Sequence, residues 1–586
     1  MSVSVEKGVI VGNTRPTVDG KQVNEFLGIP YAKPPKGDLR FRKPVPTDSW
    51  SQPLVADKWP NPCHQPPLLV PFMQNKNLSE DCLYLNIWSP FSKVRSAQLK
   101  PVMFYAYGGG LTIGSSSELH YRGEVLATRG DLIVVNFNYR LNGFGFLYTG
   151  TDDVPGNMGL WDQALALEWV HKNIKNFGGD PDKITIFGES AGSTTTSALI
   201  LSPITRNLFK NAIMMSGSAD PPTRPLSGLG SGIRQVSYFV ADGAFLPKRP
   251  HEMLESGDFH KELNLMIGNC EDEGGSVLQV FAGPLRVDAK NQLGGWSGNS
   301  TEIMQYWLKI SKQMNCTDDQ TPDKFTPKII DCLKNIDPKT LATYTSVPLD
   351  QLGSGIRQVS YFVADGAFLP KRPHEMLESG DFHKDLNLMI GNCEDEGGSV
   401  LQVFAGPLRI DAKKFDFHNP TPITYTEAYN ITKNLFSSLI LMPPINGEEV
   451  AKLYFTGLSD KTPQDALRLT IGIAFGDWVN TCANIGFAKG IYKKDPKSNV
   501  YQYYFNSKIS DWSPFCGPWM GVCHGNDVDH VFGIPFLDTK RFVDREREIS
   551  QQMMDIFTTF ARTGFGGAEW PQYYNIGGKT IARIMK

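Results

Sequence analysis

Long apolar runs and one-sided charge are both missing from this sequence of 586 residues. No apolar run approaches the ~18 residues that a membrane-spanning helix needs, so we expect no membrane span. The 58 Lys and Arg residues nearly balance the 61 Asp and Glu residues, giving a net charge of -3. This balance leaves no basic patch for nucleic acid and no polybasic signal for a membrane surface. Cysteine–histidine clusters with zinc spacing are missing too, so we expect no bound metal.

The composition that remains is typical of a globular protein with a large core. Hydrophobic residues make up 41% of the chain and charged residues 20%. The 56 glycines and 40 prolines indicate many loops between sheet elements. The length alone would suggest several domains, but α/β enzymes often run long as one unit. We expect a single α/β domain over residues 1–586.

Signals for the cellular compartment conflict. Residues 1–8 lack the apolar core of a secretory signal peptide. In contrast, two close cysteine pairs, Cys63 with Cys82 and Cys316 with Cys332, could each close a short loop, although reduced, buried thiols are the alternative. Asn-x-Ser/Thr sequons, which would make the protein a glycoprotein, begin at Asn77, Asn299, Asn315 and Asn430. We expect a secreted protein or one of the secretory pathway, with the cytoplasm as the alternative.

Residues 182–199 predict a strand, a sharp corner and a helix, with Ser190 at the corner. Ile184 and Ile186 alternate with polar neighbours, as in a strand with one buried face. Gly188 and Gly192 complete the pattern Gly-x-Ser-x-Gly, the nucleophile elbow that lifts a serine Oγ above a sheet. A bare match to this pattern is weak, because most are ordinary turns. The strand before it and the helix after it make a catalytic serine the favoured interpretation.

The elements around this corner predict a mostly parallel sheet with helices on both faces. Residues 101–107 and 131–138 are apolar runs of strand length, and apolar residues recur at helical spacing over 160–174. Strand, helix, strand, elbow and helix in this order imply crossover connections between parallel strands. A glycine triplet, 108–110, follows the first strand. Backbone without side chains there allows N–H groups to approach a substrate oxygen, whose developing negative charge needs fixed donors.

An internal repeat complicates the chain. Residues 229–290 and 352–413 are nearly identical, with differences only at Glu262 against Asp385 and Val287 against Ile410. Unlike the units of a solenoid, the two copies do not abut, because residues 291–351 separate them. Each copy carries the same Asp-Glu-Gly-Gly string, so one position in the fold has two candidate segments. The surplus copy must loop out, pack as an extra lobe or compete for the native position.

Several long strings, in order along nearly the whole chain, resemble the type-B carboxylesterase and cholinesterase family of α/β-hydrolases. The strings begin at Asn24 (Asn-Glu-Phe-Leu-Gly-Ile-Pro-Tyr-Ala), Ser79 (Ser-Glu-Asp-Cys-Leu-Tyr-Leu-Asn), Tyr107 (Tyr-Gly-Gly-Gly), Gly188 (Gly-Glu-Ser-Ala-Gly) and Trp570 (Trp-Pro-Gln-Tyr). The resemblance implies an α/β-hydrolase fold and a serine hydrolase that cleaves carboxylic esters through an acyl-enzyme, without any cofactor. Its partner would be a small-molecule ester.

The resemblance also implies roles for individual residues. Ser190 would be the nucleophile, and the backbone of Gly109, Gly110 and Ala191 would form the oxyanion hole. His524, in a His-Gly segment ahead of Phe-Gly-Ile-Pro, matches the catalytic histidine. It would accept the proton of the serine and return it to the leaving alcohol. His530 lies nearby in the sequence and is expected to be a structural or surface histidine.

Two glutamates match the acid of the triad, one in each copy of the repeat. In the family, a Cys-containing segment lies between the elbow and the acid; here that segment is 315–334, after Glu273 and before Glu396. This order favours Glu396, with the first copy as the surplus insertion, although the two copies are chemically equivalent. Glu396 would fix the tautomer of the imidazole and stabilise the imidazolium.

Two further residues depart from the family pattern. Leu111 follows the glycine triplet where the family usually has Phe, and Phe72 stands where cholinesterases have the tryptophan that holds choline. Phenylalanine binds a quaternary ammonium more weakly than tryptophan, which favours a general carboxylesterase. The alternative function is a non-catalytic adhesion or binding domain of the same fold, but such relatives typically lose the serine or the histidine. A third alternative is a chain that cannot fold productively because of the extra copy.

Overall fold

The computed structural model describes residues 1–66, 77–91, 98–219, 300–321, 323–344, 362–404, 410–437, 446–510, 516–565, 570 and 582–585. The first copy of the repeat, with Glu273, lies outside these residues, as do Phe72 and Asn299. Most of the second copy lies within them.

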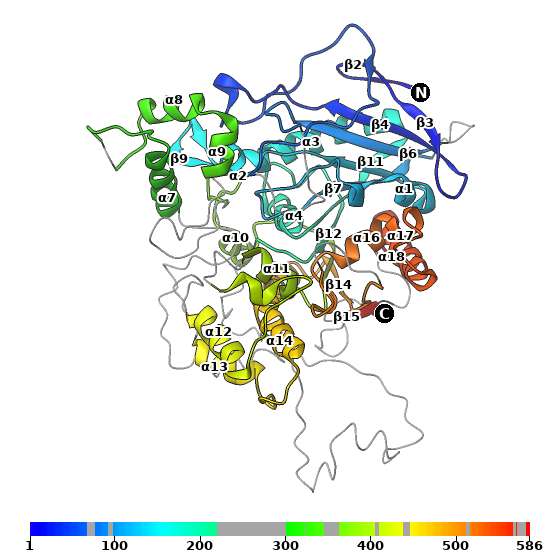
Figure 1. The fold of residues 1–586 in the computed structure, drawn as a ribbon. Helices are drawn as coiled ribbons and strands as arrows, with labels where there is room; N and C mark the ends of the chain where they lie inside the picture. The colour runs from blue at the N-terminus through cyan, green and yellow to red at the C-terminus, as the bar shows by residue number, and fades with distance from the viewer. Residues whose placement is uncertain are drawn as a thin grey trace.

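A ten-stranded sheet forms the centre of the molecule (Figure 1). Its strands lie in the order β15 (Ala582–Met585), β14 (Asn499–Phe505), β13 (Asn387–Cys393), β12 (Asn211–Met215), β11 (Gly179–Glu189), β7 (Lys100–Ala106), β8 (Ile133–Phe137), β6 (Tyr84–Pro90), β4 (Gln22–Pro30) and β3 (Asn13–Pro16). Pairing is parallel from β15 to β8 and antiparallel from β8 to β3. The mostly parallel α/β sheet predicted from the sequence is confirmed.

Two small sheets accompany the large one. One contains β1 (Ser2–Val5), β2 (Gly8–Val11) and β5 (Leu54–Val55), and the other pairs β9 (Tyr148–Thr151) with β10 (Val154–Pro155).

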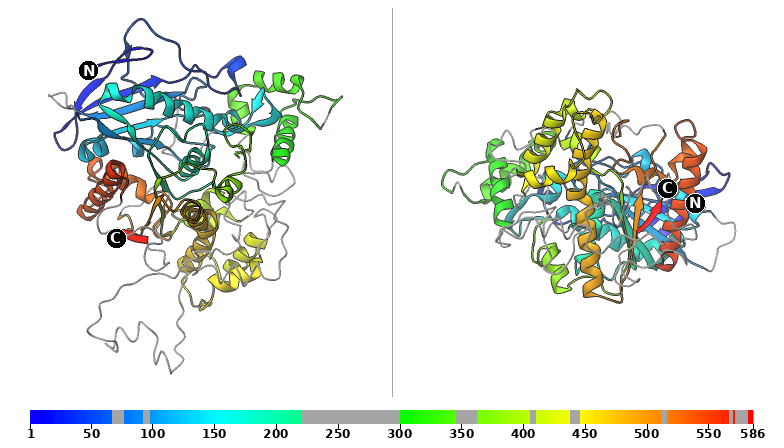
Figure 2. Two further views of the ribbon diagram at one scale, coloured as in Figure 1. Left: turned by 180° about the vertical axis from the view of Figure 1, so that it is seen from behind. Right: turned by 90° about the horizontal axis from the view of Figure 1, so that it is seen from below.

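Helices pack against both faces of the large sheet (Figure 2). The helices of the described residues are α1 (Glu124–Gly130), α2 (Asn142–Phe146), α3 (Met158–Asn173), α4 (Ala191–Leu201), α7 (Ser300–Gln313), α8 (Pro327–Asn335), α9 (Pro338–Tyr344), α10 (Pro373–Ser379), α11 (Gly397–Phe404), α12 (Tyr425–Ser437), α13 (Gly447–Tyr454), α14 (Gln464–Gly476), α15 (Cys482–Lys494), α16 (Asn526–Phe532), α17 (Ile534–Leu537) and α18 (Asp544–Thr563). Short 3₁₀ turns are η1 (Gly37–Leu39), η2 (Leu119–Tyr121), η3 (Ile174–Phe177) and η6 (Ala412–Phe415), and a π-helical turn, η7 (Asp477–Thr481), joins α14 to α15.

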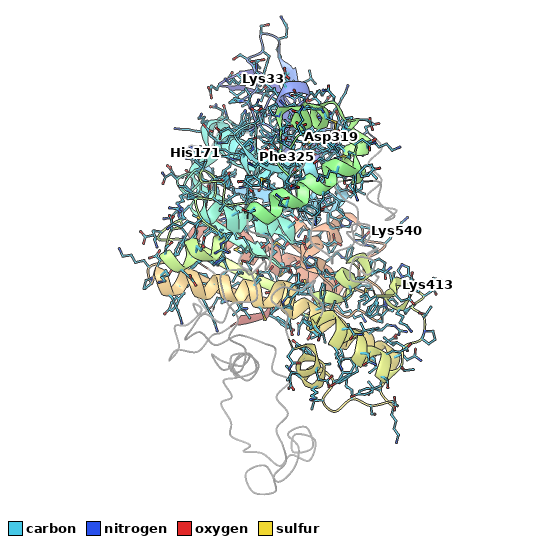
Figure 3. All side chains as sticks on the ribbon, turned by 90° about the vertical axis from the view of Figure 1, so that its left-hand side faces the viewer. Lys33, His171, Asp319, Phe325, Lys413 and Lys540 are labelled. Carbon is cyan, nitrogen blue, oxygen red and sulfur yellow. A yellow bond between two sulfur atoms is a disulfide. The ribbon has the colours of Figure 1, made fainter. Side chains whose placement is uncertain are left out.

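The central strands are buried because they are apolar on both faces. Every residue of β8 and of β12 is buried, as expected for parallel strands covered by helices on each side. Two satellite clusters extend this core. One involves α7, α8 and α9, and the other involves α11 to α14 together with Trp519, Met520 and Cys523. In Figure 3, Asp319 and Phe325 mark the α7–α8 segment, and Lys413, lower in this view, marks the segment before α12.

Three disulfides are present in the described residues. Cys63–Cys82 and Cys316–Cys332 are the two pairs that the sequence predicts. The third, Cys516–Cys523, was not predicted and closes a short loop directly before His524. Cys393 and Cys482, also in the described part of the chain, are not in a disulfide.

Candidate active site

Ser190 stands at the junction between β11 and α4 in a strained backbone conformation. Its φ is 55° and its ψ is -124°, a conformation that non-glycine residues rarely adopt. The chain turns tightly enough that a Cβ on Gly192 would lie 2.0 Å from the carbonyl oxygen of Ala106, and one on Gly188 would lie 2.5 Å from Gly192. Both glycines of the motif are therefore required by space. The Ser190 backbone N–H donates to the Met215 carbonyl (2.9 Å), which fixes the corner to β12.

The glycine triplet after β7 lies against this corner. A Cβ on Gly108 would lie 2.9 Å from Cβ of Ser190 and 2.6 Å from Oε2 of Glu189. Gly109 has a φ of 110°, and a Cβ there would meet the Ile113 carbonyl oxygen at 2.2 Å. Ala191 is the first residue of α4, so its N–H has no acceptor within the helix and lies at the positive end of the helix dipole. Gly108 and Ala191 thus lie beside Ser190, and the predicted oxyanion-hole residues Gly109 and Gly110 follow Gly108 directly in the chain.

Glu396 follows β13 and is 2% exposed. Each of its oxygens accepts more than one hydrogen bond. The donors to Oε1 are Ser216 Oγ (2.5 Å), Cys393 N (2.7 Å) and Asn392 Nδ2 (3.2 Å), and those to Oε2 are His524 Nδ1 (2.5 Å) and Asn480 Nδ2 (3.3 Å). With this many donors, neither oxygen of the buried carboxyl group is left without a hydrogen bond.

Two reciprocal hydrogen bonds form a clamp between the segments that carry Glu396 and His524. The Asp395 backbone N–H donates to the Val522 carbonyl (2.9 Å), and the Asp395 carboxylate accepts from the Val522 N–H (2.8 Å). Asp395 also forms a parallel β-bridge with Cys523. Because Asp395 precedes Glu396 and Cys523 precedes His524, this clamp sets the register in which the two side chains meet.

The imidazole of His524 lies between two carboxylates. Its Nδ1 is bonded to Glu396, and its Nε2 lies 3.1 Å from Oε1 of Glu189. Burial opposes the imidazolium, but the charges of Glu189 and Glu396 outweigh it and raise the pKa of His524 to about 9. Burial also raises the pKa of Glu189 to about 7, although the positive charge of His524 opposes this shift. Among the described residues, the Ser190 hydroxyl makes no hydrogen bond, so Nε2 is paired with Glu189 and not with the serine.

The sequence interpretation missed three of the polar residues at this site. Glu189 is the variable residue of Gly-x-Ser-x-Gly, and its position directly before the serine was the one available signal. Ser216 follows β12, and Asn480 lies in the π-helical turn, both far from Glu396 in the sequence. His530 is fully buried, and its Nδ1 lies 3.0 Å from the Asn526 carbonyl oxygen, as expected of a structural histidine.

Comparison with protein families identifies the fold and its chemistry. The model of the carboxylesterase family matches residues 1–225 and 289–584. The chain belongs to the carboxylesterase family. The unmatched stretch between these two segments nearly coincides with the first copy of the repeat, residues 229–290.

Curated relatives of this carboxylesterase family member include cholinesterases. It is 32% identical to an acetylcholinesterase of Leptinotarsa decemlineata over 97% of this chain and 80% of the relative. It is 30% identical to acetylcholinesterase-1 of Trittame loki, over 97% of this chain and 88% of that protein. A cholinesterase of Mus musculus is 30% identical over 96% of this chain and 78% of its own length.

The protein is therefore a serine hydrolase of carboxylic esters, and a non-catalytic role is not favoured. Its substrates are small-molecule esters. Within the part of the chain that the structure describes, no helix has the length and apolarity to cross a membrane. The same residues contain no cluster of His, Cys, Asp and Glu suited to a metal ion.

Proposed function

We propose that Ser190, His524 and Glu396 form the catalytic triad of this ester hydrolase. The observation that carries this proposal is the 2.5 Å contact between His524 Nδ1 and Glu396 Oε2, next to the Ser190 corner. Glu396 holds the proton on Nδ1, which leaves Nε2 to take the proton of the Ser190 hydroxyl. Attack on the ester carbonyl gives an acyl-enzyme, and water activated by the same imidazole releases the acid.

The oxyanion of each tetrahedral intermediate would be held by the N–H groups of Gly109, Gly110 and Ala191. The strained backbone at Ser190 and the glycine triplet support this assignment, because both bring backbone N–H groups towards the reacting oxygen without any side chain between them. Before each attack, Nε2 of His524 must leave Glu189 and turn to the serine. The pairing with Glu189 thus describes a resting arrangement of the base.

We assign the acid to Glu396 and treat residues 1–586 as one catalytic domain with a surplus insertion. Residues of the second copy form α10, β13 and α11, and β13 pairs on both sides within the large sheet. The family match leaves out a stretch that nearly equals the first copy. Both observations support the second copy as the one that occupies the native position.

A general, uncharged carboxylic ester is the substrate class we favour over a choline ester. Phe72, which lies outside the described residues, stands where cholinesterases have the tryptophan that holds choline, and phenylalanine binds a quaternary ammonium more weakly. Cholinesterases among the relatives support the choline ester as the second candidate. Measuring kcat/KM for nitrophenyl butyrate and for acetylthiocholine distinguishes the two substrate classes. We expect the larger kcat/KM for nitrophenyl butyrate.

Three variants test the triad with a short-chain nitrophenyl ester. Ser190→Ala should abolish hydrolysis above the solution background, because no other group replaces the nucleophile. Glu396→Gln should lower kcat by about a hundredfold or more, whereas Glu273→Gln in the first copy is the matched control and should leave kcat unchanged. Hydrolysis retained in Ser190→Ala would reject the mechanism. Loss of activity in Glu273→Gln alone would move the acid to the first copy.

A further inference from the structure

Asn480 is a polar residue in the core that none of the proposed chemical steps uses. It lies in the π-helical turn η7 between α14 and α15 and is 3% exposed. The wider backbone of a π-helical turn pushes a side chain out of its normal helical position, and such turns are frequent at functional sites.

Glycines let α14 approach the acid segment closely enough for this contact. A Cβ on Gly397, the residue after Glu396, would lie 2.0 Å from the Gly472 carbonyl oxygen. A Cβ on Gly476, the last residue of α14, would lie 2.5 Å from the Gly397 nitrogen and 2.8 Å from Cβ of Glu396. The backbone of α14 therefore lies directly on the turn that carries Glu396, and η7 begins at the point of contact.

The amide of Asn480 lies between the acid and the histidine. Its Nδ2 is 3.3 Å from Glu396 Oε2 and 3.3 Å from His524 Nδ1. An amide nitrogen only donates, and Nδ1 of His524 is already a donor to the same carboxylate oxygen. The hydrogen bond of Asn480 therefore goes to Glu396, and two donors converge on Oε2. With the amide turned the other way, its oxygen would face the carboxylate, which is unfavourable.

We propose that Asn480 is a positioning residue of the catalytic site, which fixes Glu396 Oε2 in the direction of His524 Nδ1 and shares its negative charge. This inference rests on the proposed triad. Without Asn480, Oε2 would keep a single donor, and rotation of the carboxylate would let the imidazole leave the orientation needed for Ser190. A neutral donor suits this place because His524 already lies between two carboxylates.

Other ionisable groups also surround the pair formed by Glu396 and His524. Glu189, at the end of β11, faces Nε2 of His524. Asp527 on α16 acts on His524 through its charge and accepts a hydrogen bond from the hydroxyl of Tyr503 on β14 (2.7 Å). Burial, together with the charges of Asp527 and Glu396, raises the pKa of the Cys393 thiol on β13. A substitution of Asn480 alone leaves all of these side chains in the sequence.

The test compares Asn480→Leu and Asn480→Asp with a control at Asn173. Asn173 is also a buried donor (2% exposed; Nδ2 to the Trp169 carbonyl, 2.9 Å), but it lies at the end of α3 away from the triad. Asn480→Leu should lower kcat about tenfold on the nitrophenyl ester with little change in KM, because one hydrogen bond to a charged group is lost. Asn480→Asp keeps the size of the side chain and adds a negative charge beside the imidazole. It should move the acid limb of the kcat/KM profile to higher pH by about one unit or more.

Asn173→Leu should lower the melting temperature yet leave the midpoint of the acid limb unchanged. Active sites are counted with a fluorophosphonate, so that kcat refers to folded enzyme. A kcat within about twofold of wild type in Asn480→Leu, or an acid limb in Asn480→Asp no different from that of the control, would overturn the proposal. Such a result with Ser190→Ala still inactive would reject the role of Asn480 alone, whereas an active Ser190→Ala would reject the triad itself.

Discussion

Replacing Glu189 by glutamine should make the enzyme more active at low pH relative to its own plateau. The carboxylate of Glu189 lies 3.1 Å from Nε2 of His524, the atom that accepts the serine proton in the proposed mechanism. A base works only when it is neutral, so a raised pKa of His524 removes activity as the pH falls. Glu189→Gln removes the largest of the carboxylate charges that raise this pKa to about 9 against the effect of burial.

The size of the effect follows from the geometry. A unit charge at 3.1 Å is worth about 5 kcal/mol at an effective dielectric constant of about 20. The observed shift must be smaller, because the pKa of Glu189 is itself raised to about 7 and the pair titrates together. With its burial unchanged and Glu396 still in place, the pKa of His524 should fall by about 1 to 2 units.

The measurement is kcat/KM for a nitrophenyl ester over about pH 5 to 10, in wild type, Glu189→Gln and Glu168→Gln. Glu168 is a partly exposed glutamate on α3 that makes an ion pair with Lys172, so its replacement is the same change of charge far from the imidazole. The acid limb should move to lower pH in Glu189→Gln only. An acid limb that stays in place, or moves to higher pH, would refute the electrostatic reasoning.

Two further predictions concern the disulfides and the sequons. Replacing Cys516–Cys523 by two alanines should lower kcat, because the loop before His524 is released, and cost about 2 kcal/mol of stability. The same change at Cys63–Cys82 should cost stability without changing kcat per folded site; equal effects on kcat would contradict a local role. The sequons at Asn77, Asn315 and Asn430 are exposed, so protein isolated from a eukaryotic secretory pathway should lose mass when N-glycans are removed enzymatically. An unchanged mass would favour the cytoplasm.

Local features of the fold were predictable because short-range sterics determine them. The strands expected at 101–107 and 131–138 appear as β7 (Lys100–Ala106) and β8 (Ile133–Phe137), and the helix expected over 160–174 is α3 (Met158–Asn173). The corner at Ser190 could be recognised because only glycine fits at 188 and 192. The antiparallel strands β3, β4 and β6 were not predicted, because the sequence of a strand does not determine which edge of the sheet it joins.

Contacts between distant residues explain most of what the sequence did not reveal about the site. Asn480 is 84 residues from Glu396, and the pairing of His524 Nε2 with Glu189 depends on where two separate loops end. No local pattern marks a residue for such a contact. Local sequence also does not show which copy of the repeat joins the sheet, because residues 264–270 and 387–393 have identical sequences and equal strand propensity. Order along the chain was therefore the only argument for Glu396.

The order of strands in the sheet explains why this site needs residues beyond a triad. Ser190 follows β11 and Glu396 follows β13, and β12 lies between these two strands. Neighbouring strands are about 4.8 Å apart, so the serine and the acid start from positions about 10 Å apart. An imidazole can connect them only if it is held over the intervening strand. Ser216, directly after β12, donates to Oε1 of Glu396, while His524 and Asn480 donate to Oε2. With both oxygens engaged, the carboxylate is held against rotation and keeps Nδ1 of the imidazole, and only Nε2 has to turn from Glu189 to Ser190 in the proposed mechanism.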